Sequence, residues 1–130
     1  KKSKTKIELR ANPGLIVKGD KTLLYWSFEN IIKNALESLS QIDDGLLSIK
    51  AKINKNNWII IDFTDNGYGI LRKNKSKIFN PGFSTKKRGW GIGLNLSKRI
   101  INHHHYGNLS LIKASHKKTT FRISLKLSTS

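Results

Sequence analysis

The segment that constrains the fold most is an apolar strand that leads directly into a glycine-rich turn. Residues 58–63 read Trp-Ile-Ile-Ile-Asp-Phe and predict a buried strand. The turn that follows reads Asp65-Asn66-Gly67-Tyr68-Gly69-Ile70. A carboxylate there could accept a hydrogen bond from an exocyclic amine such as adenine N6, and the glycines would let the backbone approach a flat base closely. The same residues would also suit an ordinary turn with a capping aspartate.

The rest of the chain predicts strands and helices within one domain. Strands are expected at 6–10, 15–17, 46–53, 58–63, 109–114 and 119–127. Asp20 can cap a helix over 21–39, in which an apolar stripe recurs at helical spacing: Leu24, Phe28, Ile31, Ala35 and Leu39. A second helix is expected over 94–105, ended by Gly107. Residues 71–92 are polar and lack clean periodicity, which is typical of a functional lid or of disorder.

Composition narrows the class of protein. The chain contains no cysteine, which excludes disulfides and thiolate catalysis, and no run of about 18 apolar residues that could span a membrane. Methionine is absent, even at position 1, so we interpret residues 1–130 as a single domain of a longer protein. The net charge of +17 suits nucleic-acid binding, but it also suits solvated lysines on every face or the attraction of anions such as ATP.

Two asparagines are candidate ligands. Asn30 and Asn34 lie one turn apart on the predicted helix and share a face, which also holds Glu37 and has Lys33 nearby. Amide oxygens suit Mg²⁺, which keeps most of its waters and takes phosphate oxygens as ligands. Two asparagines on a solvated helix would give the same pattern.

A glycine cluster precedes the second helix. Gly89, Gly91 and Gly93 occur at alternate positions, with Lys86 just upstream. A glycine-rich loop that leads into a helix N-terminus forms an anion site from free N–H groups and the helix dipole. The spacing is neither the Walker nor the Rossmann pattern. The three histidines at 103–105 would point about 100° apart on a regular helix, so they could not chelate one metal ion together.

Taken in this order, these segments resemble the ATP-binding catalytic domain of sensor histidine kinases. That domain belongs to a superfamily that also contains the ATPase domains of DNA gyrase and MutL. The similar segments are the N box at 28–35, the G1 box at 65–70, the F box at 78–86 and the G2 box at 89–94. The F and G2 boxes are most similar to those of nitrogen-regulation-type kinases. The resemblance covers about residues 6–127, and it departs from the family at Lys118, where glycine is frequent.

The resemblance implies a fold and a set of roles. The fold would be a two-layer α/β sandwich, the Bergerat fold, with a mixed sheet of about five strands, helices on one face and a mobile ATP lid at 71–92. Asn34 would coordinate Mg²⁺, and Asn30 would lie beside the triphosphate. Asp65 would bind the adenine amine, helped through water by Thr119. Further nucleotide contacts would come from Lys33, Glu37, Gly67, Gly69, Ile70, Phe79, Ser84, Thr85, Lys86, Gly89, Gly91, Ile92, Gly93 and Leu94.

Asn30 also bears on the reaction. The resemblance places it where gyrase-like ATPases carry a glutamate that activates water. Asparagine cannot act as a general base, so hydrolysis should be slow and the γ-phosphoryl group kept for a protein acceptor. Glu29 projects about 100° away from Asn30 on the helix, and we expect it to face the acceptor side.

The resemblance therefore implies half of an enzyme. The domain would bind ATP and Mg²⁺ and donate the γ-phosphoryl group to a histidine on a dimerisation domain that this sequence lacks. A response regulator would be the downstream partner. The domain would lie in the cytoplasm, and the parent protein would be either a cytoplasmic kinase or a membrane-anchored sensor. An anti-sigma-factor-type serine/threonine kinase of the same superfamily is the closest alternative, and a basic nucleic-acid-binding module is the alternative from a different class.

Overall fold

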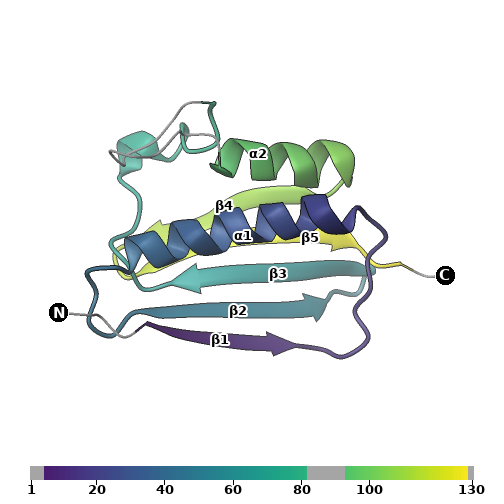
Figure 1. Cartoon of the computed structure of the whole chain (residues 1–130), viewed down its shortest axis with the longest axis horizontal. Coiled ribbons are helices and arrows are strands. Elements are labelled where there is room, and N and C mark those ends of the chain that lie inside the picture. Colours follow the sequence, from purple (N-terminus) through teal and green to yellow (C-terminus); the bar gives the residue numbers. More distant parts are fainter. Residues whose placement is uncertain (1–4, 82–92, 129–130) are drawn as a thin grey trace.

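The protein has two layers, a five-stranded mixed sheet and a helical layer on one face of it (Figure 1). The computed structural model describes residues 5–81 and 93–128, and the expected α/β sandwich is confirmed. No helix in these ranges is long and apolar enough to cross a membrane. In chain order the elements are β1 (Lys6–Ala11), α1 (Lys21–Ser38), β2 (Leu46–Ile53), β3 (Trp58–Asp65), the 3₁₀-helix η1 (Arg72–Asn74), α2 (Gly93–Arg99), the π-helix η2 (Ile100–His104), β4 (Asn108–Ser115) and β5 (Lys118–Lys126).

The order of strands across the sheet is β1-β2-β3-β5-β4. β1 and β2 run parallel, whereas all other neighbours are antiparallel. β3 extends to Asp65 rather than stopping at Phe63 as predicted. The register between β3 and β5 sets Asp65 opposite Thr119. Two predicted site residues therefore meet at one end of two interior strands.

α1 begins and packs as the sequence predicts. The carboxylate of Asp20 caps the helix, because its Oδ1 accepts a hydrogen bond from the Leu23 N–H at 2.9 Å. The apolar stripe faces the sheet, with Ile31, Ala35 and Leu39 buried. The stripe holds the helix against the sheet because each buried aliphatic side chain of Leu or Ile size contributes about 1.5–3 kcal/mol.

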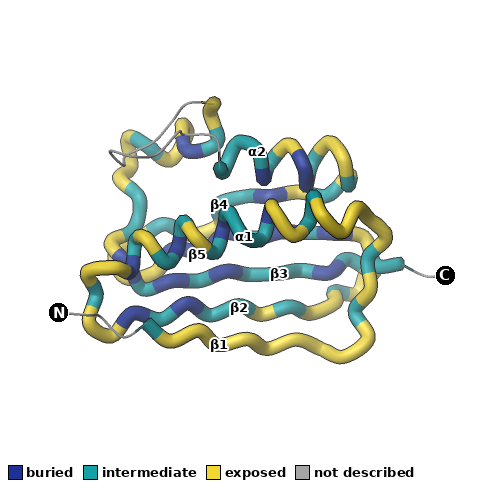
Figure 2. The backbone as a smooth tube through the Cα atoms, viewed as in Figure 1, coloured by how far each residue is buried: buried dark blue, intermediate teal, exposed yellow. Residues whose placement is uncertain are grey.

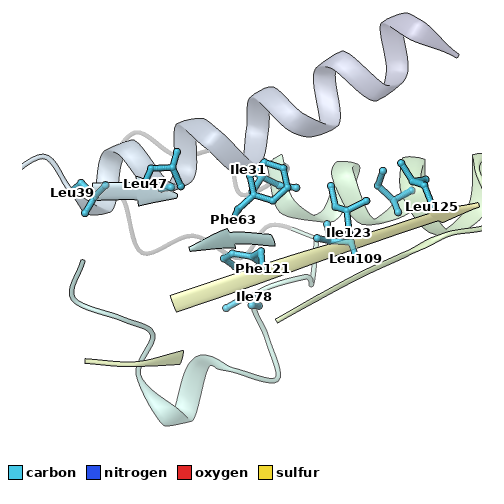
Figure 3. Packing of buried hydrophobic residues seen from close by; sticks show 11 residues of the cluster. Ile31, Leu39, Leu47, Phe63, Ile78, Leu109, Phe121, Ile123 and Leu125 are labelled. Atoms are coloured by element: carbon cyan, nitrogen blue, oxygen red, sulfur yellow. The ribbon is translucent and has the colours of Figure 1, made fainter. Parts of the chain in front are cut away.

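The core lies between the helices and the helix-facing side of the sheet (Figure 3). Leu47, Phe63 and Phe121 come from three neighbouring strands and lie below α1. The full buried cluster consists of Ile31, Ala35, Leu39, Leu47, Phe63, Ile78, Ile101, Leu109, Phe121, Ile123 and Leu125. Ile78 belongs to the segment predicted as a lid, so the described part of that segment is anchored in the core.

The second helix differs from its prediction as one regular helix over 94–105. α2 is α-helical from Gly93 to Arg99, and the chain then widens into the π-helix η2. At its end the ring of His105 makes two hydrogen bonds: Nδ1–H donates to the Ile100 carbonyl and Nε2 accepts the Asp20 N–H, both at 2.9 Å. The second bond reaches the start of α1. Local periodicity could not predict a helix end that is fixed by so distant a residue.

The predicted strand over 15–17 is wrong. Val17 forms only an isolated bridge with Leu127, and the Ser128 N–H donates to the Ile16 carbonyl at 2.7 Å. The segment between Gly14 and the cap Asp20 thus makes a single bridge and not a ladder. It crosses the end of the sheet instead.

The helices leave β1 uncovered (Figure 2). All residues of β1 are exposed, including Ile7 at 55% and Leu9 at 70%. α1 and α2 lie over the part of the sheet that holds β3, β5 and β4 (Figure 1). β1 is thus an edge strand whose apolar side chains lack a covering helix among the described elements.

Candidate functional site

Asp65 is an almost fully buried carboxylate at the end of β3, with 6% of the residue exposed. Its Oδ1 accepts hydrogen bonds from the Gly67 N–H at 2.9 Å and from the Ser38 hydroxyl at 3.5 Å. Burial raises the pKa of Asp65, and these two hydrogen bonds offset the rise only in part. An added donor from a ligand would therefore interact strongly with this carboxylate.

Thr119 lies opposite Asp65 on β5 and is 4% exposed. Its Oγ1 is buried and has no hydrogen-bond partner among the described residues. An unsatisfied buried hydroxyl costs roughly 1–3 kcal/mol, so native proteins seldom keep one unless a water or ligand completes it. The pair of Asp65 and Thr119 offers one charged acceptor and one hydroxyl to such a ligand.

The two glycines after Asp65 are required by packing. A Cβ on Gly67 would lie 2.9 Å from the Ser38 Oγ and 3.0 Å from the Asp65 Oδ1. Gly69 has φ +87°, and a Cβ there would lie 2.8 Å from the Ser115 carbonyl oxygen. The turn thus fits closely between α1 and the hairpin of β4 and β5. This fit is a separate reason for glycine, beside the predicted approach of a base.

The second predicted group lies on the flank of α1. Asn30 and Asn34 are half-buried and one turn apart. The Asn30 Nδ2 donates to the Gly93 carbonyl at 3.4 Å, a long bond that brings the start of α2 beside α1. A Cβ on Gly93 would make ordinary van der Waals contact with Asn30, with the nearest atoms at 3.8 Å. Ser38 continues the flank one turn beyond Asn34, about 12 Å from Asn30 along the axis.

The other predicted site residues lie outside this group. Lys33 and Glu37 are exposed, and Glu29 is partly exposed about 100° around the helix from Asn30. Ile70 and Leu94 are partly buried and pack against the core. Six predicted contacts lie outside the described residues: Ser84, Thr85, Lys86, Gly89, Gly91 and Ile92.

Phe79 connects the predicted lid segment to the body of the protein. Its ring meets Phe121 edge-on at 6.1 Å, and the Lys98 ammonium lies 4.8 Å from its centroid. Its carbonyl accepts a hydrogen bond from the Asn95 Nδ2 at 3.0 Å. Burial lowers the pKa of Lys98, whose Nζ also donates to the Leu109 carbonyl at 2.7 Å. Phe79 is therefore fixed by α2 and β5 within the predicted lid segment.

Sequence reasoning missed two polar residues of the site. Ser38 donates to Asp65, and its spacing of four from Asn34 repeats the spacing of the asparagines, a signal that could have identified it. Asn66 holds the turn to the start of β2, because its Oδ1 accepts the Leu46 N–H at 2.8 Å and its Nδ2 donates to the Asp44 carbonyl at 2.9 Å. That role depends on distant backbone and has no local signal.

A surface cavity of about 340 Å³ lies elsewhere, lined by Val17, Lys18, His105 and residues 125–128. It is at the opposite end of β5 from Thr119 and contains none of the predicted site residues. The buried polar pair of Asp65 and Thr119, together with the Asn30 flank, therefore defines the candidate site better than this hollow does.

Comparison with known proteins gives one family. The family described as histidine kinase-, DNA gyrase B-, and HSP90-like ATPase matches residues 19–129. Sporulation kinase B of Bacillus subtilis is 36% identical over 119 residues, which cover 92% of this chain and 27% of that protein. The C4-dicarboxylate transport sensor protein DctB of Rhizobium meliloti is 30% identical over 113 residues, which cover 87% of this chain and 18% of that protein. The chain thus spans about a quarter or less of these relatives.

Solved structures share the fold. The nucleotide-free catalytic domain of histidine kinase ThkA superposes with a TM-score of 0.82 at 24% identity, covering 95% of this chain and 79% of that one. Full-length ShkA in complex with AMPPNP gives a TM-score of 0.80 at 17% identity, covering 97% of this chain and 26% of that one.

Proposed function

The chain belongs to the family of histidine kinase-, DNA gyrase B-, and HSP90-like ATPases, and we propose that it is the ATP-binding catalytic domain of a two-component sensor histidine kinase. It binds ATP with Mg²⁺ and donates the γ-phosphoryl group to a histidine on a separate dimerisation domain. The observation that carries the proposal is the buried Asp65 carboxylate beside the unpartnered Thr119 hydroxyl. The similarity to sensor kinases favours a histidine acceptor over the serine of an anti-sigma-factor-type kinase.

The adenine end of the site fits the chemistry of the base. Asp65 accepts a hydrogen bond from the exocyclic amine, and it keeps its orientation through the Gly67 N–H and the Ser38 hydroxyl. Thr119 completes its own hydrogen bonding through a water between its hydroxyl and the base. The glycines at 67 and 69 let the turn lie close against Ser38 and Ser115, because a Cβ at either position would clash there.

The phosphate end lies along the flank of α1. ATP, when bound, supplies the phosphoryl group that is transferred. Asn34 holds Mg²⁺ through its amide oxygen, and Asn30 lies beside the phosphates next to the Gly93 backbone. Since an amide cannot take a proton from water, the site lacks a base at Asn30 and preserves the phosphoryl group for a protein acceptor. Lys86 and the glycines at 89 and 91 complete the predicted phosphate contacts, and Glu29 faces the acceptor domain.

The partners follow from this role. The proposed acceptor is the dimerisation domain of the same kinase, and a response regulator receives the phosphoryl group next. The proposed location is the cytoplasm, because ATP is available there. The nitrogen-regulation subtype stays a prediction from the F and G2 boxes.

Urea unfolding with and without Mg-ATP and a phosphotransfer assay test the proposal together. Saturating Mg-ATP should stabilise the chain, by about 2.7 kcal/mol at one hundred times the dissociation constant. The chain alone should not label itself from γ-labelled ATP. Its histidines at 103–105 lie about 15 Å along the helix from the Gly93 end, and His116 lies in the turn between β4 and β5. Addition of the dimerisation domain of the same kinase should restore transfer.

Two results would contradict the proposal. The first is an acid-labile phosphohistidine formed by the chain alone and abolished by mutation of one of its own histidines. The second is the absence of any stabilisation by Mg-ATP together with salt-sensitive retention on DNA, which is the behaviour of a basic nucleic-acid-binding module.

A further inference from the structure

β1 presents an open backbone edge. On its inner side, Lys6 N–H donates to the Gly45 carbonyl and Asn12 N–H donates to the Ala51 carbonyl. The backbone N–H and C=O groups alternate in direction along a strand, so those of the even-numbered residues of β1 point toward β2. The N–H and C=O groups of Ile7, Leu9 and Ala11 therefore point away from the sheet. No described strand lies on that side of β1.

The side chains of β1 have two distinct faces. Leu9 pairs with Ile49 of β2, which packs against the core, so Ile7 and Leu9 lie on the helix-facing side. Glu8 and Arg10 pair with residues on the opposite side of the sheet. A long, exposed edge strand with apolar side chains is a template for another strand. β4, the other edge, is different, because its ladder is irregular between Leu111 and Lys113.

We propose that β1 pairs antiparallel with β1 of a second copy of this chain, with Leu9 of one copy opposite Leu9 of the other. This register sets Glu8 of each copy opposite Arg10 of the other, so both charged pairs are complementary. Ile7 then lies opposite Ala11. The hydrogen-bonded pairs form between residues whose backbone groups point away from β2, namely Ile7, Leu9 and Ala11. Glu8 and Arg10 occupy the other positions, where opposed side chains come closer.

Charge selects this register over its neighbours. Centring the pair on Glu8 would place the two glutamates opposite each other and Lys6 opposite Arg10, which is unfavourable. Centring it on Ile7 also pairs opposite charges, Lys6 with Glu8, but it would place Arg10 of each copy opposite Lys4 of the other, a pair of like charges. The Leu9-centred register pairs the whole stretch from Ile7 to Ala11, and it places both helical layers on the same side of one continuous sheet.

Single cysteine variants test the register directly, because the chain has no cysteine of its own. Opposed hydrogen-bonded residues lie about 5.5 Å apart at Cα, within the reach of a disulfide. Leu9→Cys should form a disulfide-linked dimer on mild oxidation, detected on a non-reducing gel. Ile7→Cys should not crosslink to itself but should crosslink to Ala11→Cys in a mixture. Ile112→Cys, 45% exposed at the other edge, is the matched control and should stay monomeric.

Charge swaps test the pairing without a covalent bond. Glu8→Arg or Arg10→Glu alone places like charges opposite and should weaken self-association in sedimentation equilibrium. The double variant Glu8→Arg with Arg10→Glu restores opposite charges and should recover it. Thermal melting checks that each variant is folded. The measurements need moderate salt, because each copy carries a net charge of +17.

Three outcomes with the variants would overturn the proposal. They are equal crosslinking of Leu9→Cys and Ile112→Cys, self-crosslinking of Ile7→Cys in place of Leu9→Cys, and a folded double charge swap that associates no better than the single variants. A wild-type chain that stays monomeric at every concentration would also refute it. Nucleotide binding is measured separately, so these results do not depend on the proposed kinase function.

Discussion

Asp65→Asn should weaken ATP binding without harming the fold. The substitution keeps the shape and can still accept the Gly67 N–H through its amide oxygen. Its NH₂ group would then face the adenine amine, a donor against a donor. Loss of a hydrogen bond to a charged group costs roughly 1.5–3 kcal/mol, which corresponds to about a tenfold to a hundredfold rise in the dissociation constant. Calorimetric titration with Mg-ATP measures the change.

The Asp65→Asn variant should lose ATP affinity and keep its thermal stability. Burial raises the pKa of Asp65, so the charged carboxylate is held at a cost in the folded state, and the neutral amide removes that cost. The nucleotide-free variant should therefore melt at the wild-type temperature or above it. Asp62→Asn is the matched control: Asp62 lies on the other face of β3 and pairs with Arg122 at 2.8 Å. That change should leave ATP affinity unaltered.

A comparison of ATP with GTP tests the contact between Asp65 and the base more sharply. Guanine presents a carbonyl oxygen where adenine presents the amine, so the new NH₂ group can donate to GTP. Asp65→Asn should therefore reduce the preference for ATP over GTP. An unchanged preference, or an ATP affinity equal to that of the wild type in a folded Asp65→Asn protein, would refute the contact with the base.

Three further outcomes concern stability. Gly69→Ala should lower the free energy of unfolding by at least about 1 kcal/mol in urea titration, because of the positive φ and the close Ser115 carbonyl. Asp65 should contribute to the unfolding free energy of the apo protein fully below about pH 4, and this contribution should be lost as the pH rises through the raised folded-state pKa of Asp65. Urea titration of the wild type and of Asp65→Asn across pH isolates this contribution. Phe79→Ala should cost up to about 1.5–3 kcal/mol, whereas a variant as stable as the wild type in urea would contradict the anchoring contact with Phe121.

The sequence predicts what depends on neighbours along the chain. The apolar stripe from Leu24 to Leu39 requires only helical periodicity, and Asp20 requires only its place before the helix, so both are confirmed. The turn at Asp65 was identified because a strand and two glycines flank it. Val17 was misjudged because three apolar residues satisfy a strand pattern, although whether a strand forms depends on a pairing partner elsewhere.

The parts of the site that arise from tertiary contact were beyond local patterns. That Asp65 lies opposite Thr119 follows from the register of β3 with β5, which joins segments far apart in the sequence. The hydroxyl of Ser38 reaches Asp65 only because α1 crosses the end of β3. The hydrogen bond from the Asp20 N–H to the His105 ring joins the start of α1 to the end of η2, two segments far apart in the sequence. These contacts are consequences of the assembled sheet, so no single segment encodes them.

The two stripes of α1 limit how this protein can change in length. Ile31, Ala35 and Leu39 face the core, while Asn30, Asn34 and Ser38 form the flank of the site, each series at a spacing of four. One inserted or deleted residue inside the helix would turn everything beyond it by about 100°. The residues of both stripes beyond that point would then turn away from the core and from the site together. Insertions and deletions inside α1 are therefore disruptive, whereas single substitutions can alter one stripe and leave the other intact.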